Sequence, residues 1–107
     1  MPLDTITRSH WFVYFVRTRH QALYCGITND VERRFAQHCA GKGAKALVGK
    51  GPLTLEWFHS VDSGRAVASR VEYQLKQLKK CQKESLVSGL TRLEILNDEG
   101  VISIKLI

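Results

Sequence analysis

The hydrophobic positions near the start of the chain predict two neighbouring strands. The segment Trp11–Val16 (WFVYFV) is entirely aromatic or β-branched, which is typical of a strand buried on both faces. Residues 22–28 form the predicted partner strand. If residues 18–20 close a three-residue hairpin loop, Tyr14 lies opposite Tyr24 and both phenol groups leave the same face of the pair.

A helix is predicted to follow the second strand. Asp30 and its two predecessors are residue types that commonly cap helix N-termini. The apolar stripe predicted for this helix consists of Val31, Phe35 and Cys39. Arg34 and His38 are four residues apart and border this stripe, so both can face a cleft beside the sheet, whereas Arg33 points to solvent.

The rest of the chain predicts further alternation of strands and helices. Residues 53–61 read as a third strand, and a second helix begins near Ser63 as its N-cap. The expected core stripe of that helix is Val67, Val71, Leu75 and Leu78, with Ala68 at its margin. A basic helical segment continues from Lys79 and stops at Gly89.

The C-terminal residues predict less regular structure. Residues 91–97 are expected to form one or two helical turns, and residues 101–107 a strand-like tail. Such a tail can dock on the edge of the sheet or pair between chains.

Size and composition favour one globular domain over residues 1–107. The hydrophobic share of 44% and charged share of 24% are ordinary for a folded protein. No apolar run is long enough to cross a membrane, and residues 1–10 lack the apolar centre of a signal peptide, so we expect a cytoplasmic protein. The three cysteines are far apart, which favours reduced, partly buried thiols over disulfides or a zinc site.

Positive charge is concentrated in the middle of the chain. The net charge is +6, and between Arg33 and Lys83 eleven basic residues stand against three acidic ones. A surface that only needs to be soluble would carry positive and negative charges interspersed. The concentration of positive charge therefore favours a nucleic acid partner.

A glycine- and lysine-rich segment, residues 41–51, follows the first helix. Its lysines, at positions 42, 45 and 50, can supply point charges to phosphates, and its glycines can expose backbone amides. A flexible loop with solvated lysines explains the composition equally well. The glycine spacing does not match a Walker motif, so no nucleotide cofactor is expected.

Glu72 is an isolated carboxylate in this basic region. It can form a salt bridge with Lys76 at i,i+4, worth at most about 0.5 kcal/mol, or hold a divalent cation beside a phosphate-binding surface. Spacing alone favours the salt bridge. It likewise favours structural roles for Tyr14, Tyr24 and Arg34, because such residues are common on half-buried surfaces.

The order of these residues resembles the GIY-YIG nuclease family, in particular its small stand-alone bacterial YhbQ-like branch. Val13-Tyr14-Phe15 stands at the GIY position and Tyr24-Cys25-Gly26 at the YIG position. Arg34, His38 and Glu72 follow with the family's order and spacing. The resemblance covers residues 10–88.

The resemblance implies an α/β (α+β) domain with a three-stranded antiparallel sheet flanked by helices. Residues 10–88 would form the nuclease core and residues 89–107 a C-terminal extension. The implied activity is hydrolysis of DNA by a single-metal endonuclease using Mg²⁺ or Mn²⁺. No membrane partner is expected, and RNA remains open as a second substrate.

The same resemblance assigns roles to particular residues. The catalytic residues would be Tyr14, Tyr24, Arg34, His38 and Glu72, gathered in one cleft with Arg34 and Glu72 on the same side of the sheet. Tyr14 would orient or deprotonate the attacking water, Arg34 would neutralise the phosphate, and Glu72 would hold the metal. Contacts to DNA would come from Gly26, Lys42, Lys45, Lys50, Arg70 and Lys76, with Gly26 leaving room for the phosphate backbone.

Departures from the family pattern keep a second hypothesis open. Val13 replaces the first glycine of GIY, Cys25 replaces the isoleucine of YIG, and the only asparagine after Glu72 is Asn97. The missing asparagine favours a non-catalytic nucleic-acid-binding module that keeps the basic cleft. A third hypothesis is a protein-interaction domain that uses the strand-like tail.

Overall fold

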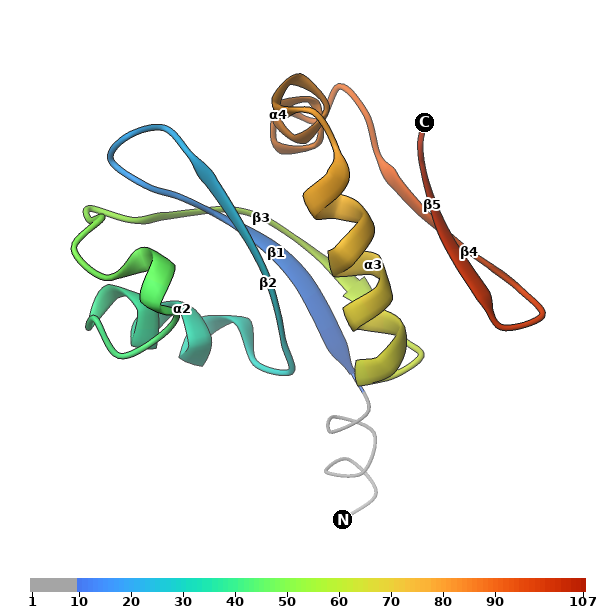
Figure 1. The fold of residues 1–107 in the computed structure, drawn as a ribbon, viewed down its shortest axis with the longest axis horizontal. Coiled ribbons are helices and arrows are strands. Elements are labelled where there is room, and N and C mark those ends of the chain that lie inside the picture. Colours follow the sequence, from blue (N-terminus) through green and yellow to red (C-terminus); the bar gives the residue numbers. More distant parts are fainter. Residues whose placement is uncertain (1–9) are drawn as a thin grey trace, which may run out of the picture.

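Three antiparallel strands organise the protein. The computed structural model describes residues 10–107, so the expectation about export, which rests on the first ten residues, falls almost entirely outside the described part. The strands are β1 (Trp11–Arg17), β2 (Leu23–Thr28) and β3 (Thr54–Val61), in the order β2-β1-β3 (Figure 1). All four residues from Val13 to Val16 are buried, which confirms the expectation for the first strand.

The β1–β2 register differs from the expected one by two residues. Tyr14 pairs with Gly26, and Tyr24 pairs with Val16. The hairpin loop is longer than three residues, because the amide of Thr18 donates to the carbonyl of Ala22 at 2.9 Å. Since side chains alternate with a period of two, a shift of two residues still leaves both tyrosines on one face.

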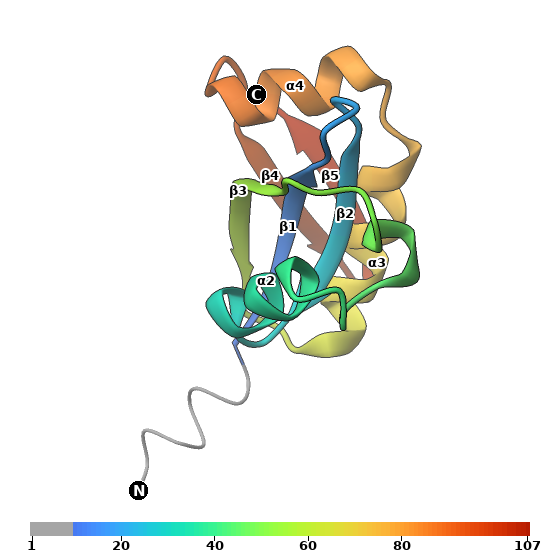
Figure 2. The ribbon, with the colours of Figure 1, turned by 90° about the vertical axis from the view of Figure 1, so that its left-hand side faces the viewer.

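Helices cover both faces of the sheet, which confirms the expected fold class. Helix α2 (Val31–Cys39) packs on the face of Tyr14, and α3 (Arg65–Gln77) packs on the opposite face, against Phe15. Figure 2 shows α2 in front of the sheet and α3 behind it. Helix α4 (Lys80–Ser88) follows α3 and ends at Gly89 in the left-handed conformation, as expected. No helix in residues 10–107 has the length and apolar character to span a membrane.

Two details of the helices differ from the sequence expectations. Helix α3 begins after Gly64, at φ 89°, and has no side-chain cap, so Ser63 is not its N-cap. On α2 the buried residue is His38, while Cys39 is exposed. Cys81 is also exposed, and only Cys25 of the three thiols is buried. The buried face of α2 is therefore rotated toward His38.

The C-terminal residues form a β-hairpin. Residues 101–106 are a strand, as expected, but residues 93–98 pair with it as a second strand instead of forming helical turns. Strands β4 (Leu93–Asp98) and β5 (Val101–Leu106) make a separate two-stranded sheet. Glu99 and Gly100 join them with φ angles of 53° and 85°, as a tight two-residue hairpin turn requires. The side-chain amide of Gln74 donates to the carbonyl of Ile102 at 2.6 Å and accepts from the amide of Ile104 at 3.1 Å, so α3 covers the edge of β5.

An ion-pair cluster joins the end of β1 to α4. The guanidinium of Arg17 donates to both carboxylate oxygens of Glu84 at 2.7 Å, and Lys80 contacts the same carboxylate at 3.1 Å. The bond from Arg17 is the main cause that lowers the pKa of Glu84 to about 2 from its usual 4.5. This bidentate geometry is the strongest form of the Arg–carboxylate pair.

We expect this cluster to make the fold sensitive to acid. The pKa of Glu84 is depressed on folding, so its stabilising contribution is present above pH 4.5 and is lost as pH falls toward about 2. Urea denaturation across this pH range measures the effect. The free energy of unfolding should fall more steeply for the natural sequence than for Glu84→Gln. The control Glu99→Gln, at an exposed position, should follow the natural sequence.

Candidate functional site

A buried hydrogen bond between Tyr14 and His38 forms the centre of the site. Tyr14 comes from β1 and His38 from the last turn of α2, and each residue is only 2% exposed. The Tyr14 hydroxyl and His38 Nε2 lie 2.7 Å apart. Burying a hydroxyl and an imidazole without partners would be costly, so this bond fixes how the helix docks on the sheet.

Tyr24 completes an aromatic cluster around this bond. Its ring centroid lies 6.4 Å from that of Tyr14 and 5.7 Å from that of His38. Tyr24 is half-buried, so the cluster opens toward solvent on its side. The structure thus brings three of the five expected catalytic residues into one group.

Gly26 makes room for Tyr14. A Cβ atom at Gly26 would lie 2.5 Å from the Tyr14 hydroxyl oxygen and 2.6 Å from Cζ, closer than real Cβ contacts. Gly26 is also buried. The space expected for a phosphate backbone is therefore filled by the Tyr14 ring, and a side chain here would displace that ring.

Arg34 lies on α2 one turn before His38. It is half-buried, and its Nη1 donates to Gln37 Oε1 at 3.0 Å. Arg34 and Gln37 help to line a cavity of about 200 Å³ at the start of α2. The positive charge of Arg34 lowers the pKa of both Tyr14 and His38, although burial is the larger influence on each group. Arg34 is thus the fourth of the five expected catalytic residues to lie on the α2 face of the sheet.

Burial decides the protonation states of the central pair. It raises the pKa of Tyr14 to about 12, with a smaller contribution from Tyr24, and the opposing effect of Arg34 is weaker. Arg34 thus acts in favour of the phenolate, but burial outweighs it in the free protein. Burial, followed by the charge of Arg34, lowers the pKa of His38. Near neutral pH, Tyr14 and His38 are both uncharged.

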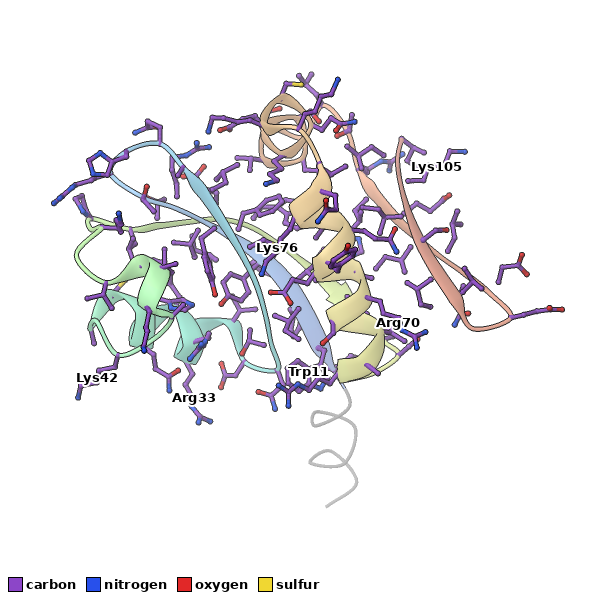
Figure 3. The ribbon with its side chains drawn as sticks, viewed as in Figure 1. Trp11, Arg33, Lys42, Arg70, Lys76 and Lys105 are labelled. Atoms are coloured by element: carbon purple, nitrogen blue, oxygen red, sulfur yellow. The ribbon has the colours of Figure 1, made fainter. Side chains whose placement is uncertain are left out.

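Glu72 lies in the other layer, contrary to expectation. It belongs to α3, which covers the face opposite to α2, so Arg34 and Glu72 are not on the same side of the sheet. Its carboxylate is 21% exposed and pairs with Lys76 at 3.4 Å. Figure 3 shows Lys76 extending from α3 toward β2.

Glu72 lies near the edge strand β2. Burial, then the charge of Glu72, raises the pKa of Cys25 to about 12, which places the carboxylate near that strand. Strand β2 is at the edge of the sheet, and its residue Tyr24 packs on the opposite face, with Tyr14. Within residues 10–107 no cluster of three or more His, Cys, Asp or Glu residues could hold a metal ion.

The basic residues expected to bind DNA do not form one surface. Lys42 follows α2, which carries Arg33, whereas Arg70 and Lys76 belong to α3 (Figure 3). Arg70 donates to the carbonyl of Gly100 at 2.9 Å, so its guanidinium is directed at the C-terminal hairpin, away from Tyr14 and His38. Lys45 lies in a short 3₁₀ helix, η1 (Lys45–Leu47), and Lys50 follows it.

Two residues of the site were not identified from the sequence. The amide of Ala44 donates to His38 Nδ1 at 3.3 Å. Gly43 has no room for a side chain, because a Cβ atom there would lie 2.1 Å from the same nitrogen. The glycine-rich composition of residues 41–51 was the available indication, but it suggested flexibility or phosphate contacts instead.

Comparison with known proteins points to one protein family. The sequence model of the GIY-YIG catalytic domain matches residues 10–85. A UPF0213 protein of Vibrio parahaemolyticus is 63% identical over 93 residues, which cover 87% of each chain. The UPF0213 protein YhbQ of Escherichia coli is 53% identical over 96 residues, covering 89% of this chain and 95% of YhbQ. The solution NMR structure of a UPF0213 protein of Bacillus halodurans is 39% identical, covers 74% of this chain and 83% of its own, and has a TM-score of 0.47.

The raised pKa of Tyr14 can be measured directly. In an ultraviolet absorbance titration, one of the three tyrosines should ionise at about pH 12, because burial disfavours the charged phenolate. This step should be absent from Tyr14→Phe and present in the control Tyr73→Phe. Circular dichroism at each pH shows that the protein remains folded. A step near 12 that persists in Tyr14→Phe would contradict the assignment.

Proposed function

The chain belongs to the GIY-YIG catalytic domain family, a nuclease family, and on this premise we propose that it is a metal-dependent endonuclease acting on DNA. The observation that carries the proposal is the Tyr14–His38 hydrogen bond beside Arg34, within the residues that the GIY-YIG catalytic domain model matches. A buried tyrosine hydroxyl held by an imidazole and approached by a guanidinium is a group prepared for proton transfer at a phosphate.

Each residue of the cluster has a distinct task in hydrolysis. Tyr14 takes the proton of the attacking water, and it must first lose its own proton because it is neutral in the free protein. Arg34 lowers the pKa of Tyr14 and binds the phosphate, whose charge grows in the transition state. Tyr24 supports Tyr14 through aromatic packing and positions the phosphate beside it.

The chemistry of Glu72 fits one ligand of Mg²⁺ or Mn²⁺. Mg²⁺ is often held by one or two carboxylates together with substrate phosphates and water, so a single carboxylate meets its needs. Glu72 has an exposed part, and its pair with Lys76 at i,i+4 contributes only about 0.5 kcal/mol, which a cation can replace. When bound, the ion would supply positive charge to the phosphate and the leaving oxygen.

We infer a substrate chosen by its shape instead of its base sequence. The net charge of +6 and the lysines at positions 42, 45 and 50 are suited to phosphate contacts. Such contacts carry no sequence information, so branched, nicked or otherwise distorted DNA is the proposed substrate, and RNA offers the same phosphates.

A non-catalytic nucleic-acid-binding module is the second candidate. It is favoured by the position of Glu72, which lies in the layer opposite Arg34 and is paired with Lys76. It is also favoured by the sequence after Glu72, where Asn97 is the only asparagine. The two candidates differ in whether a divalent cation produces cleavage.

Cleavage of a branched DNA duplex in the presence of Mg²⁺ tests the proposal. Tyr14→Phe keeps the aromatic packing but removes the hydroxyl, so cleavage should fall by about 10²- to 10⁴-fold. Tyr24→Phe should lose less, because Tyr24 is given only a positioning role. Glu72→Gln should abolish cation-dependent cleavage and retain DNA binding.

The matched control for Glu72→Gln is Glu94→Gln, at an exposed position on β4. It should cleave like the natural sequence. Absence of any cleavage by the natural sequence, with DNA binding intact, would replace the endonuclease with the binding module. Full activity of Tyr14→Phe would overturn the role of Tyr14.

DNA binding should be non-specific and should weaken steeply with salt. Each phosphate contact by a lysine or arginine contributes a slope of about −0.9 to the plot of log affinity against log salt. Fluorescence anisotropy with a labelled duplex measures this slope. Lys42→Ala should make the slope less negative, whereas Arg70→Ala, whose guanidinium is directed at Gly100, should leave it unchanged. A slope near zero would contradict the electrostatic interpretation.

A further inference from the structure

The segment after α2 contacts the side of the His38 ring that faces away from Tyr14. The backbone amide of Ala44 donates to Nδ1 at 3.3 Å, while Nε2 faces the Tyr14 hydroxyl at 2.7 Å. Both ring nitrogens of His38 are therefore engaged inside the protein. The charge and orientation of this ring are set by its neighbours before any substrate arrives.

Gly43 allows this close approach. A Cβ atom at position 43 would lie 2.1 Å from Nδ1 and 2.9 Å from Cε1 of His38, so any side chain must displace the ring. Gly41 and Gly49 have positive φ angles, but Gly43 does not, and its backbone is therefore open to other residues. Space beside His38, and not backbone conformation, is what requires glycine here.

The donor at Nδ1 determines where the imidazole carries its proton. A neutral imidazole has one protonated and one unprotonated nitrogen. Nδ1 accepts from the Ala44 amide and must be the unprotonated one. With the opposite tautomer, the Ala44 amide and a protonated Nδ1 would oppose each other as two donors.

We propose that the Gly43–Ala44 backbone locks His38 in the Nε2-protonated tautomer, so that the imidazole donates a hydrogen bond to Tyr14 and cannot accept the tyrosine proton. The inference deepens the proposed nuclease function and rests on it for its catalytic meaning. His38 is then a positioning residue for Tyr14, and Gly43 is a positioning residue for His38.

The lock determines the route of the Tyr14 proton. Because Nε2 already carries a proton, Tyr14 cannot pass its own proton to His38. The hydroxyl proton instead leaves to water on the side of the half-buried Tyr24. The bond from Nε2 then stays in place and stabilises the phenolate that forms. Arg34 acts on the same oxygen in the same direction.

The tautomer can be observed in the free protein, without DNA. The experiment uses ¹⁵N-labelled histidine in the full chain, and the signals of His38 among the four histidines are assigned with the variant His38→Gln. We expect a protonated Nε2 and an unprotonated Nδ1. Tyr14→Phe should show the same tautomer, because the Ala44 donor remains. A ring protonated at Nδ1 overturns the proposal whether or not the protein cleaves DNA.

Two glycine variants test the role of the loop. Gly43→Ala should displace the ring, so the single tautomer gives way to a mixture. Gly51→Ala lies in the same segment, where a Cβ atom finds its nearest atom at 3.9 Å, and should keep the natural tautomer. A Gly43→Ala protein that is folded by circular dichroism and keeps only the Nε2-protonated form would overturn the role of Gly43.

Cleavage kinetics separate a donor from a proton acceptor at position 38. The glutamine amide in His38→Gln can donate to Tyr14 but cannot accept a proton as a base. His38→Gln should therefore retain at least about tenfold more activity than His38→Ala. Disturbing the proton transfer at Tyr14 is expected to lower activity by roughly 10²-fold or more, so a tenfold difference between the variants is measurable. Equal activity of the two folded variants would overturn the donor role. The NMR measurement stands independently if the proposed nuclease function fails.

Discussion

The hydrogen bond between Tyr14 and His38 joins the sheet to α2 at a point where both residues are buried. Both residues are 2% exposed, so each depends on the other for a partner, and the helix must dock at one depth and rotation. Two glycines make this arrangement possible. Gly26 leaves space for the hydroxyl on one side, and Gly43 leaves space for the imidazole on the other. Neither glycine has a side chain, and each thereby leaves the space that the Tyr14–His38 pair requires.

Burial also determines what the site must do to become active. It raises the pKa of Tyr14 to about 12 and outweighs the opposing charge of Arg34, so the resting site holds a neutral phenol beside a neutral imidazole. A neutral pair avoids the cost of a buried charge in the absence of substrate. Under the proposed function, the bound cation, and not the anionic DNA, would supply the further positive charge that favours the phenolate.

Sequence patterns predicted the local structure well and its three-dimensional relations less well. The buried strand around Tyr14 followed from its continuous run of aromatic and β-branched residues, and the helix carrying Arg34 from its cap residues and apolar stripe. The structure confirms both. The register was wrong by two residues because it depended on a loop length that periodicity does not give. The same limitation misplaced Glu72, because the apolar stripe of a helix shows which of its sides is buried but not which face of the sheet it covers. The role of Gly43 depends on a contact with His38 that no local pattern records.

The opposite placement of Arg34 and Glu72 limits how a substrate can engage both residues. The layers of α2 and α3 are separated by the sheet, and β2 is an edge strand that α3 contacts. Strand β2 also carries Tyr24, Cys25 and Gly26, with Tyr24 facing the α2 layer and Cys25 facing α3 and the charge of Glu72. We therefore expect a phosphodiester backbone that meets both Arg34 and Glu72 to cross this edge instead of lying on either face. Under the proposed function, the edge of β2 is where the two halves of the site act on one phosphate.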